Sequence, residues 1–172
     1  VGLLLFSSEV ELFVPPKKGK FHVYRILREI LFFKPKNKKT HIESALSYLR
    51  GVLKKRATIF ILSDFQDKGY ETSLTYLEKK HEVIAGLVTD PAEFAFPDVG
   101  LIDLHDAETG ETILVDTSNL AFREEIKSRF KNEFEKFKKN LKKSGVDSFS
   151  FETDDNYHKS LLAFFKRRKA AK

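Results

Sequence analysis

A hydroxyl group and a carboxylate follow the most strand-like segment of this sequence. Residues 57–62, ATIFIL, are fit for a buried strand and run directly into Ser63 and Asp64. A carboxylate at the end of a buried strand costs free energy unless something pairs with it, so Asp64 either caps a turn or belongs to a functional site. In open sheets of parallel strands, ligands gather at the carboxyl edge, where Asp64 is expected to lie.

Thr40 is the second candidate. It precedes an apolar stripe with helical spacing, and Glu43 follows three residues later, which is the pattern of a capping box. The loop before this helix could reach the edge that carries Asp64, so the two residues could form a joint site. From the residues alone, two separate caps are the simpler interpretation.

Other patterns that carry chemistry are missing from the sequence. There is no Cys, which removes disulfides, thiolate metal ligands and cysteine nucleophiles. The five His residues are dispersed, and no H-E-x-x-H, G-x-G-x-x-G, P-loop or G-x-S-x-G motif is present. Asp103 and His105 are explained better by an exposed hairpin face than by a metal site. Ser63 has no assignable base, so we expect no catalysis: the protein is predicted not to be an enzyme.

Alternating apolar segments predict the elements that position these residues. Strands are expected at residues 3–6, 10–14, 57–62, 81–89, 101–105, 112–116 and 147–152. Helices are expected around residues 23–31, 42–53, 70–79 and 126–141, and from residue 157 onward. Because strands alternate with helices, the sheet should be largely parallel, with one hairpin at the start and a second one inserted around residues 106–111.

Three details of the helices follow from local residue types. Residues 116–118, Asp-Thr-Ser, are expected to cap the long helix at its start, and Gly145 is expected to end it. The last helix is expected to bury Leu161, Leu162 and Phe165.

The bulk composition is that of a globular chain. The 172 residues are 41% hydrophobic with 17 Phe, which predicts one domain with a packed core. The net charge of +6 is diffuse, and its Lys and Arg clusters lie at expected loops and helix C-termini, where cations complement the helix dipole. No apolar run approaches the roughly 20 residues that cross a bilayer, and we expect a cytoplasmic location. Because the chain opens at Val1 inside a strand, we expect a piece of a longer protein.

Several separated segments, taken in order, resemble an uncharacterised bacterial family, domain of unknown function 58 (DUF58). They are VGLLLFSSEVELFVPPKKGK, the loop ending in Thr40, IFILSDF, and the closing DNYHKSLLAFFKRR. Members of that family look like von Willebrand factor A domains and are often associated with MoxR-type AAA+ ATPases. The resemblance implies a three-layer α/β fold of Rossmann type with an inserted β-hairpin, and residues 1–172 would form part of one such domain.

The resemblance also implies a metal-ion-dependent (MIDAS-like) site. Von Willebrand factor A domains hold a divalent cation with D-x-S-x-S after the first strand, a Thr from a later loop and an Asp after the fourth strand. Thr40 matches the Thr and Asp64 matches the Asp, and Mg²⁺ favours such oxygen ligands. The D-x-S-x-S segment would lie before Val1, so the first central strand is expected to be missing, and Mg²⁺ binding by this chain should be weak or absent.

The function that the resemblance implies is a non-catalytic protein-interaction module. It would bind a partner through a metal-dependent surface, working with a MoxR-type AAA+ ATPase. Two alternatives are a structural module with a vestigial metal site and nucleic-acid binding through the basic helices. We also expect the strands VGLLLFS and ATIFILSDF either to pair with each other or to accept a strand from another copy, because exposed edges invite pairing.

Overall fold

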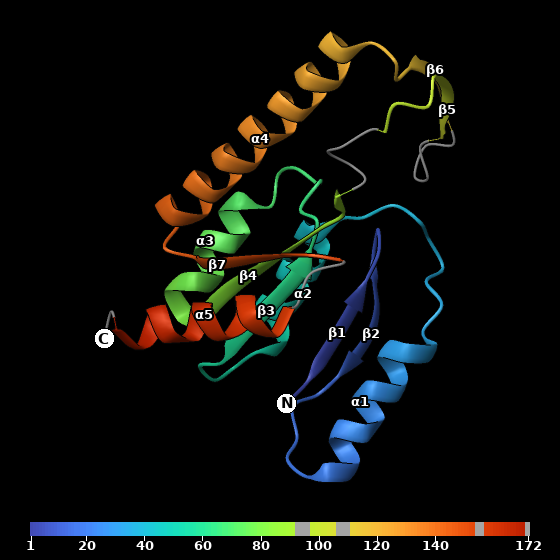
Figure 1. Ribbon diagram of the computed structural model, residues 1–172. Helices are drawn as coiled ribbons and strands as arrows, with labels where there is room; N and C mark the ends of the chain where they lie inside the picture. The colour runs from blue at the N-terminus through green and yellow to red at the C-terminus, as the bar shows by residue number, and fades with distance from the viewer. Residues whose placement is uncertain (92–96, 106–110, 154–156, 171–172) are drawn as a thin grey trace. The chain divides into compact units, whose positions relative to one another are not determined.

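The computed structural model describes residues 1–91, 97–105, 111–153 and 157–170 (Figure 1). The chain divides into two compact units. The first unit comprises Val1–Lys55 and Asp67–Ser73, and the second comprises Arg56–Gln66 and Leu74–Lys172.

The first unit contains the predicted hairpin and two helices. Strands β1 (Leu3–Phe6) and β2 (Val10–Val14) pair antiparallel. Helix α1 (Lys20–Phe32) and helix α2 (Ile42–Val52) follow, and the hairpin is joined to the start of α2 because the His41 N–H donates to the Ser7 carbonyl at 2.9 Å. The hairpin and both helices are confirmed.

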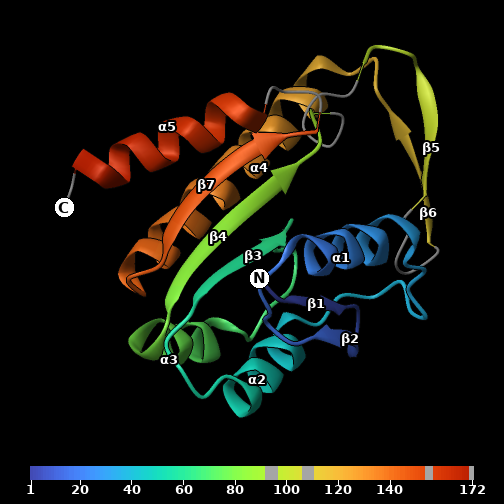
Figure 2. The ribbon, with the colours of Figure 1, turned by 90° about the horizontal axis from the view of Figure 1, so that it is seen from below.

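The second unit is built on a parallel three-stranded sheet. Strands β3 (Thr58–Ser63), β4 (Glu82–Thr89) and β7 (Asp147–Glu152) lie in the order β3-β4-β7, as Figure 2 shows. The central strand β4 has five consecutive buried residues, 83–87. Strand β3 instead alternates buried and exposed residues. The prediction of a mixed α/β fold with a parallel sheet is therefore confirmed.

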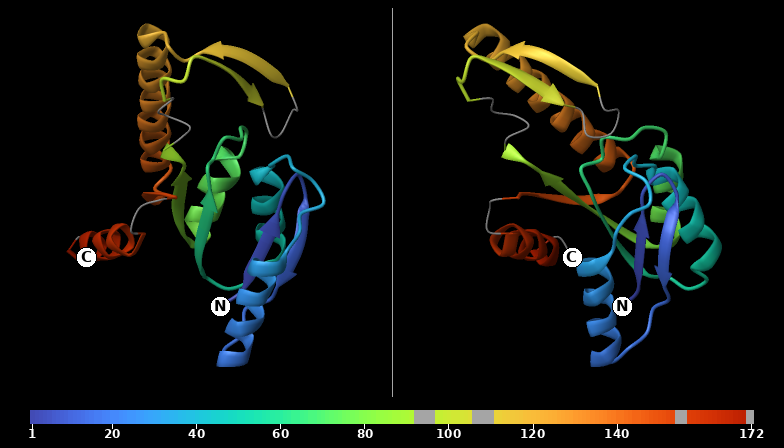
Figure 3. Two further views of the ribbon diagram at one scale, coloured as in Figure 1. Left: turned by 45° about the vertical axis from the view of Figure 1, so that its right-hand side comes forward. Right: turned by 90° about the vertical axis from the view of Figure 1, so that its right-hand side faces the viewer.

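Helices cover this sheet on both sides. Helix α3 (Glu71–Lys80) buries Leu74 and Leu77. Helices α4 (Leu120–Lys143) and α5 (Tyr157–Ala170) lie on opposite sides of β7 (Figure 3). None of the helices in the described residues is long and apolar enough to cross a membrane.

The second hairpin is also present. Strands β5 (Leu101–His105) and β6 (Thr112–Asp116) pair antiparallel, and residues 106–110 between them lie outside the described residues. The fully buried Thr117 holds the base of the hairpin: its hydroxyl donates to the Gly100 carbonyl at 2.7 Å and accepts from the Val99 N–H at 3.2 Å.

The predicted cap of the long helix is wrong by one residue. Asn119 is the N-cap of α4, and its side chain accepts from the Phe122 N–H at 3.2 Å. Asp116 instead accepts from the hydroxyl and the N–H of Ser118, at 2.6 and 3.0 Å. These hydrogen bonds lower the pKa of Asp116. Gly145 follows α4 with φ of 76°, the left-handed conformation that makes glycine a helix terminator, so that prediction holds.

The buried face of α5 also differs from the prediction. Phe164 is the buried residue, and its ring lies 5.2 Å from that of Phe149 on β7. Leu162 and Phe165, which were expected to be buried, are 60% and 44% exposed. The reason is that each residue turns a helix by about 100°, so a face centred on Phe164 leaves Leu162 on the far side.

Candidate functional site

The loop after β3 shows what Asp64 does in this structure. Asp64 Oδ1 accepts from the Gln66 N–H at 3.2 Å and from the Ser63 hydroxyl at 3.3 Å, and the Ser63 Oγ accepts from the Phe65 N–H at 3.1 Å. Such contacts from a side chain to the backbone two residues later stabilise a tight turn. Asp64 therefore caps the turn that ends β3.

Phe65 fixes the shape of that turn. Its φ of 58° is in the left-handed region, which costs about 1 kcal/mol for a residue with a Cβ. The side chain is buried, and its ring centroid lies 4.9 Å from that of Phe137 on α4. The aromatic contact offsets the backbone strain and holds the Asp64 carboxylate at the carboxyl edge of the sheet.

Two further acidic residues lie at the same edge. Asp90 directly follows β4, and Glu152 is the last residue of β7. Sequence reasoning did not single out Asp90, although its signal matches that of Asp64: a carboxylate after an apolar strand. In the described ranges, no three Asp, Glu or His residues are grouped so that they could hold a metal ion.

Thr40 does not cap helix α2, although the capping-box pattern predicted that it would. The N-cap of α2 is His41, and Thr40 precedes it without a side-chain cap. The Asp67 carboxylate takes the capping function, because its Oδ2 accepts from the Ile42 N–H at 2.7 Å. Glu43 does not close a capping box, since its Oε1 accepts from the hydroxyls of Ser47 and Ser73. A residue 25 positions away in sequence thus replaces the local cap.

The two predicted metal ligands, Thr40 and Asp64, lie in separate units of the chain. Thr40 belongs to the first unit and Asp64 to the second, so the pair stays a prediction. Asp67 is engaged by two backbone N–H groups, those of Ile42 and Lys68. Mg²⁺ is commonly bound by one or two carboxylates with waters completing the octahedron, so Thr40 and Asp64 stay the predicted ligands.

Asp103 and His105 lie on β5, as expected for an exposed hairpin face. Both residues are exposed, and the His105 Nδ1 lies 3.2 Å from the Thr112 hydroxyl on β6. This cross-strand contact gives His105 a structural role.

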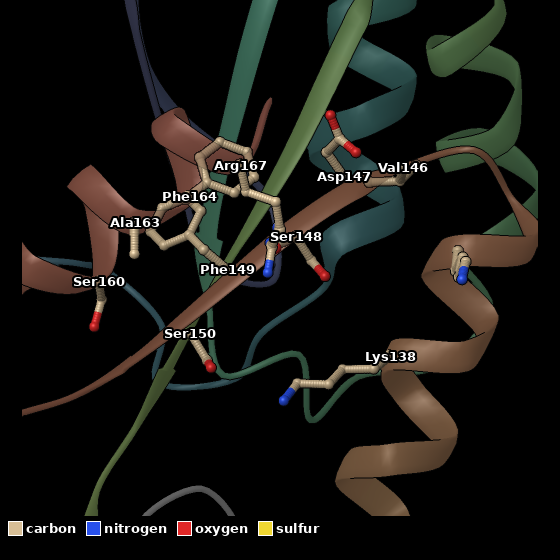
Figure 4. Close-up of a pocket in the computed structure, with 11 residues that line it drawn as sticks. Lys138, Val146, Asp147, Ser148, Phe149, Ser150, Ser160, Ala163, Phe164 and Arg167 are labelled. Atoms are coloured by element: carbon tan, nitrogen blue, oxygen red, sulfur yellow. The ribbon is translucent and has the colours of Figure 1, made fainter. Parts of the chain in front are cut away.

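A groove of about 550 Å³ lies between α4, β7 and α5 (Figure 4). Its hydroxyl groups come from Ser148, Ser150 and Ser160, and its apolar wall includes Phe149 and Phe164. Its cations are Lys138, Lys142 and Arg167. The groove was missed in the sequence, because the clusters that supply its cations were interpreted as helix C-termini, with nucleic-acid binding as the alternative.

Among the described residues that line the groove, the one carboxylate is that of Asp147, and it is ion-paired. Asp147 Oδ2 lies 2.8 Å from Arg168 Nε, and the same guanidinium pairs with Glu82. Arg167 Nη2 donates to the Ser148 carbonyl at 3.3 Å, and Lys138 Nζ is 3.9 Å from Glu135 Oε1. Lys142 has no ion-pair partner within the described residues. The groove is therefore electropositive.

The fold and the site define a mixed α/β domain with an acidic edge on its parallel sheet and a basic groove beside β7. Residues 1–136 match the family described as "Protein of unknown function DUF58". The chain belongs to the DUF58 family, as the sequence predicted. All of the described residues that line the groove lie beyond this match.

The curated relatives are uncharacterised bacterial proteins. The chain is 31% identical to the Mycobacterium tuberculosis protein Rv1480 over 113 residues, which is 64% of this chain and 36% of that protein. It is 26% identical to the Mycobacterium avium protein MAV169 over 159 residues, which is 91% of this chain and 94% of that protein. The chain thus spans about a third of the length of Rv1480 and nearly all of MAV169.

Two solved structures share the fold. The conserved hypothetical protein BatB from Bacteroides thetaiotaomicron aligns with 99% of this chain and 78% of its own, at a TM-score of 0.51 and 18% identity. An aerotolerance-related membrane protein from Bacteroides fragilis aligns with 96% of this chain and 76% of its own, at a TM-score of 0.54 and 16% identity.

Proposed function

We propose that this chain is a non-catalytic protein-interaction module whose partner binds at the carboxyl edge of the β3-β4-β7 sheet, around Asp64. The partner proposed from the family resemblance is a MoxR-type AAA+ ATPase, and the proposed location is the cytoplasm. The fold proposed for the complete domain is that of von Willebrand factor A.

One observation carries this proposal. The turn after β3 holds Phe65 in a left-handed conformation and buries its ring, so that the polar Asp64 is presented at a sheet edge that has two further acidic residues. Backbone strain that the surrounding structure maintains is often found where a loop has a binding role.

A metal ion is not required for this proposal. No three His, Asp or Glu side chains are grouped in the described residues so that they could hold a metal ion, so the proposal rests on the Asp64 carboxylate itself and not on a bound ion. The alternative is a structural module with a vestigial metal site. In that alternative, Asp64 would stabilise the turn after β3 and would not contact a partner.

Substitution of Asp64 by Asn separates these two functions. Asn keeps a side-chain oxygen that can accept from the Gln66 N–H, so the turn should persist, while the charge is lost. If Asp64 contacts the partner, the Asp64→Asn variant of the protein should bind the MoxR-type ATPase about tenfold more weakly, a change of about 1.4 kcal/mol.

The matched control is Asp103→Asn, which removes an exposed carboxylate from the β5–β6 hairpin. Binding can be measured by pull-down and quantified by surface plasmon resonance, with and without EDTA. Full binding by Asp64→Asn, together with an unchanged circular dichroism spectrum, would leave the vestigial interpretation in place.

A further inference from the structure

Strand β7 is an edge strand of its sheet, and its outer edge opens into the basic groove. Within the described residues, β7 has one neighbouring strand, β4. Helix α4 lies on one side of β7 and helix α5 on the other, so the groove follows the strand between the two helices (Figures 3 and 4). Edge strands present a row of backbone N–H and C=O groups that can pair with another extended chain.

The register shows which backbone groups of β7 face the groove. The Thr153 N–H donates to the Thr89 carbonyl. The backbone N–H and C=O groups of the odd-numbered residues of β7 therefore point toward β4. Alternate residues of a parallel strand direct their backbone groups to opposite sides, so those of Ser148 and Ser150 point outward. The contact from Arg167 to the Ser148 carbonyl agrees with this, because α5 reaches that carbonyl from the groove side.

The side chains around this edge favour a negatively charged binding partner. Lys138 and Lys142 extend from α4, and Arg167 extends from α5. Arg168 is already bound to Asp147 and Glu82, so the groove has three lining cations and no unpaired carboxylate among its described residues. Lysine beside an edge strand commonly discourages pairing. Here the charge repels basic strands and attracts acidic ones.

We propose that the groove along the outer edge of β7 binds an acidic segment of a partner protein, which adds to the sheet as a further extended strand. The backbone of Ser148 and Ser150 would pair with the segment, and the three cations would bind its carboxylates. Main-chain pairing supplies affinity in this mode of recognition, and the flanking side chains supply specificity. The inference does not depend on Asp64 or on a metal ion.

A labelled peptide of alternating Glu and Val is the probe, measured by fluorescence anisotropy at low ionic strength. Binding should weaken as salt is raised, because exposed charges are screened. A second peptide replaces each Val by Pro, which keeps the charge but removes backbone N–H donors from every second position. We expect this peptide to bind at least about tenfold more weakly.

Two double variants test the position of the site. The Lys142→Glu, Arg167→Glu variant reverses two charges that line the groove, and the Lys139→Glu, Lys143→Glu variant reverses two that do not. The first should bind the Glu-Val peptide at least about tenfold more weakly, since repulsion replaces attraction at the contact. The second should change binding by less than about threefold, the scale expected for exposed charges outside the contact.

A variant that fills the groove without changing charge provides an independent test. Ala163 on α5 lines the groove and Ala170 does not, so Ala163→Trp should impair peptide binding while Ala170→Trp should not. Circular dichroism establishes that each variant is folded.

Four outcomes would overturn the proposal. Equal loss in the two charge-reversal variants would indicate diffuse electrostatic attraction. Equal binding of the Pro peptide would exclude strand addition. Displacement of the peptide by random DNA at stoichiometric amounts would assign the groove to nucleic acid, and a dimer that the peptide dissociates would assign it to a second copy. The Asp64→Asn variant should bind the peptide normally, so this test and that of the ATPase contact can fail separately.

Discussion

Strands β3 and β4 are both apolar in sequence, but they have different positions in the sheet. β4 has a strand on each side and buries five consecutive residues. β3 has β4 on one side, buries Ile59 and Ile61, and leaves Phe60 and Leu62 46% and 58% exposed. Apolar composition therefore predicts that a segment is a strand, but only the burial of every successive residue identifies the centre of the sheet.

The largest difference in the cost of an Ala substitution, measured as lost free energy of unfolding, should be seen between Ile84 and Leu62. They lie on the same face of the two neighbouring strands, but Ile84 is fully buried. Ile84→Ala should lower the free energy of unfolding by about 2–5 kcal/mol, because it removes buried methyl groups and leaves a cavity. Leu62→Ala should cost less than about 1 kcal/mol. Urea denaturation followed by circular dichroism measures both, and equal losses would show that β3 is covered as completely as β4.

Gly86 on β4 gives a smaller expected effect, because β4 is packed closely against its neighbours at this position. A Cβ at this position would lie 2.6 Å from Leu62 Cδ2 and 2.8 Å from Phe149 Cζ. Gly86→Ala should destabilise the protein by about 1–3 kcal/mol, the usual cost of overpacking. The control is Gly51→Ala in α2, which meets no atom within 4 Å and should stabilise the protein by about 0.5–1 kcal/mol. Stabilisation by Gly86→Ala would contradict close packing across β4.

His81 lies directly before β4, and its protonation should make the stability of the protein depend on pH. Burial, with a smaller contribution from Lys80, lowers the pKa of His81 below its usual 6.5, and its Nδ1 has no hydrogen-bond partner within the described residues. As the pH falls, His81 is protonated at a higher pH in the unfolded chain than in the folded protein, and this protonation favours unfolding. The stability that neutral His81 contributes is therefore complete above about pH 6.5, and it is lost as the pH falls through the folded-state pKa.

Urea midpoints measured between pH 7.5 and 5 check this prediction. His81→Leu should flatten the profile, whereas substitution of the exposed His158 by Gln should leave its slope unchanged. A profile that is identical in all three proteins would show that His81 is protonated equally in the folded and unfolded states.

The smallest expected effect is at the end of β3. The isolated chain should bind Mg²⁺ no more tightly than millimolar, because only Thr40 and Asp64 match the predicted ligands and the described residues contain no metal-binding group of three. Isothermal calorimetry should give the same weak signal for the unmodified chain and for Asp64→Ala. Micromolar binding that Asp64→Ala abolishes would contradict this.

Periodicity and turn residues were sufficient to predict the strands and helices. The apolar run of β4 and the Pro-terminated helix α1 are local signals, and local signals survive folding. The missed features depend on residues far apart in sequence. Asp67 caps α2 from 25 residues away, and the groove needs α4, β7 and α5 together. A pattern within one segment cannot report which distant side chain reaches it.

The ion pairs of Arg168 affect the order in which the protein gains stability during synthesis. This guanidinium, on α5, contacts Glu82 at the start of β4 and Asp147 at the start of β7, while Thr58 at the start of β3 donates to the same Glu82. All three strands can leave the ribosome before the cation that joins their amino ends. Because Arg168 lies on α5, its ion pairs with Glu82 and Asp147 can form only after α5 has been synthesised, so this part of the stability of the sheet should be gained after all three strands have emerged.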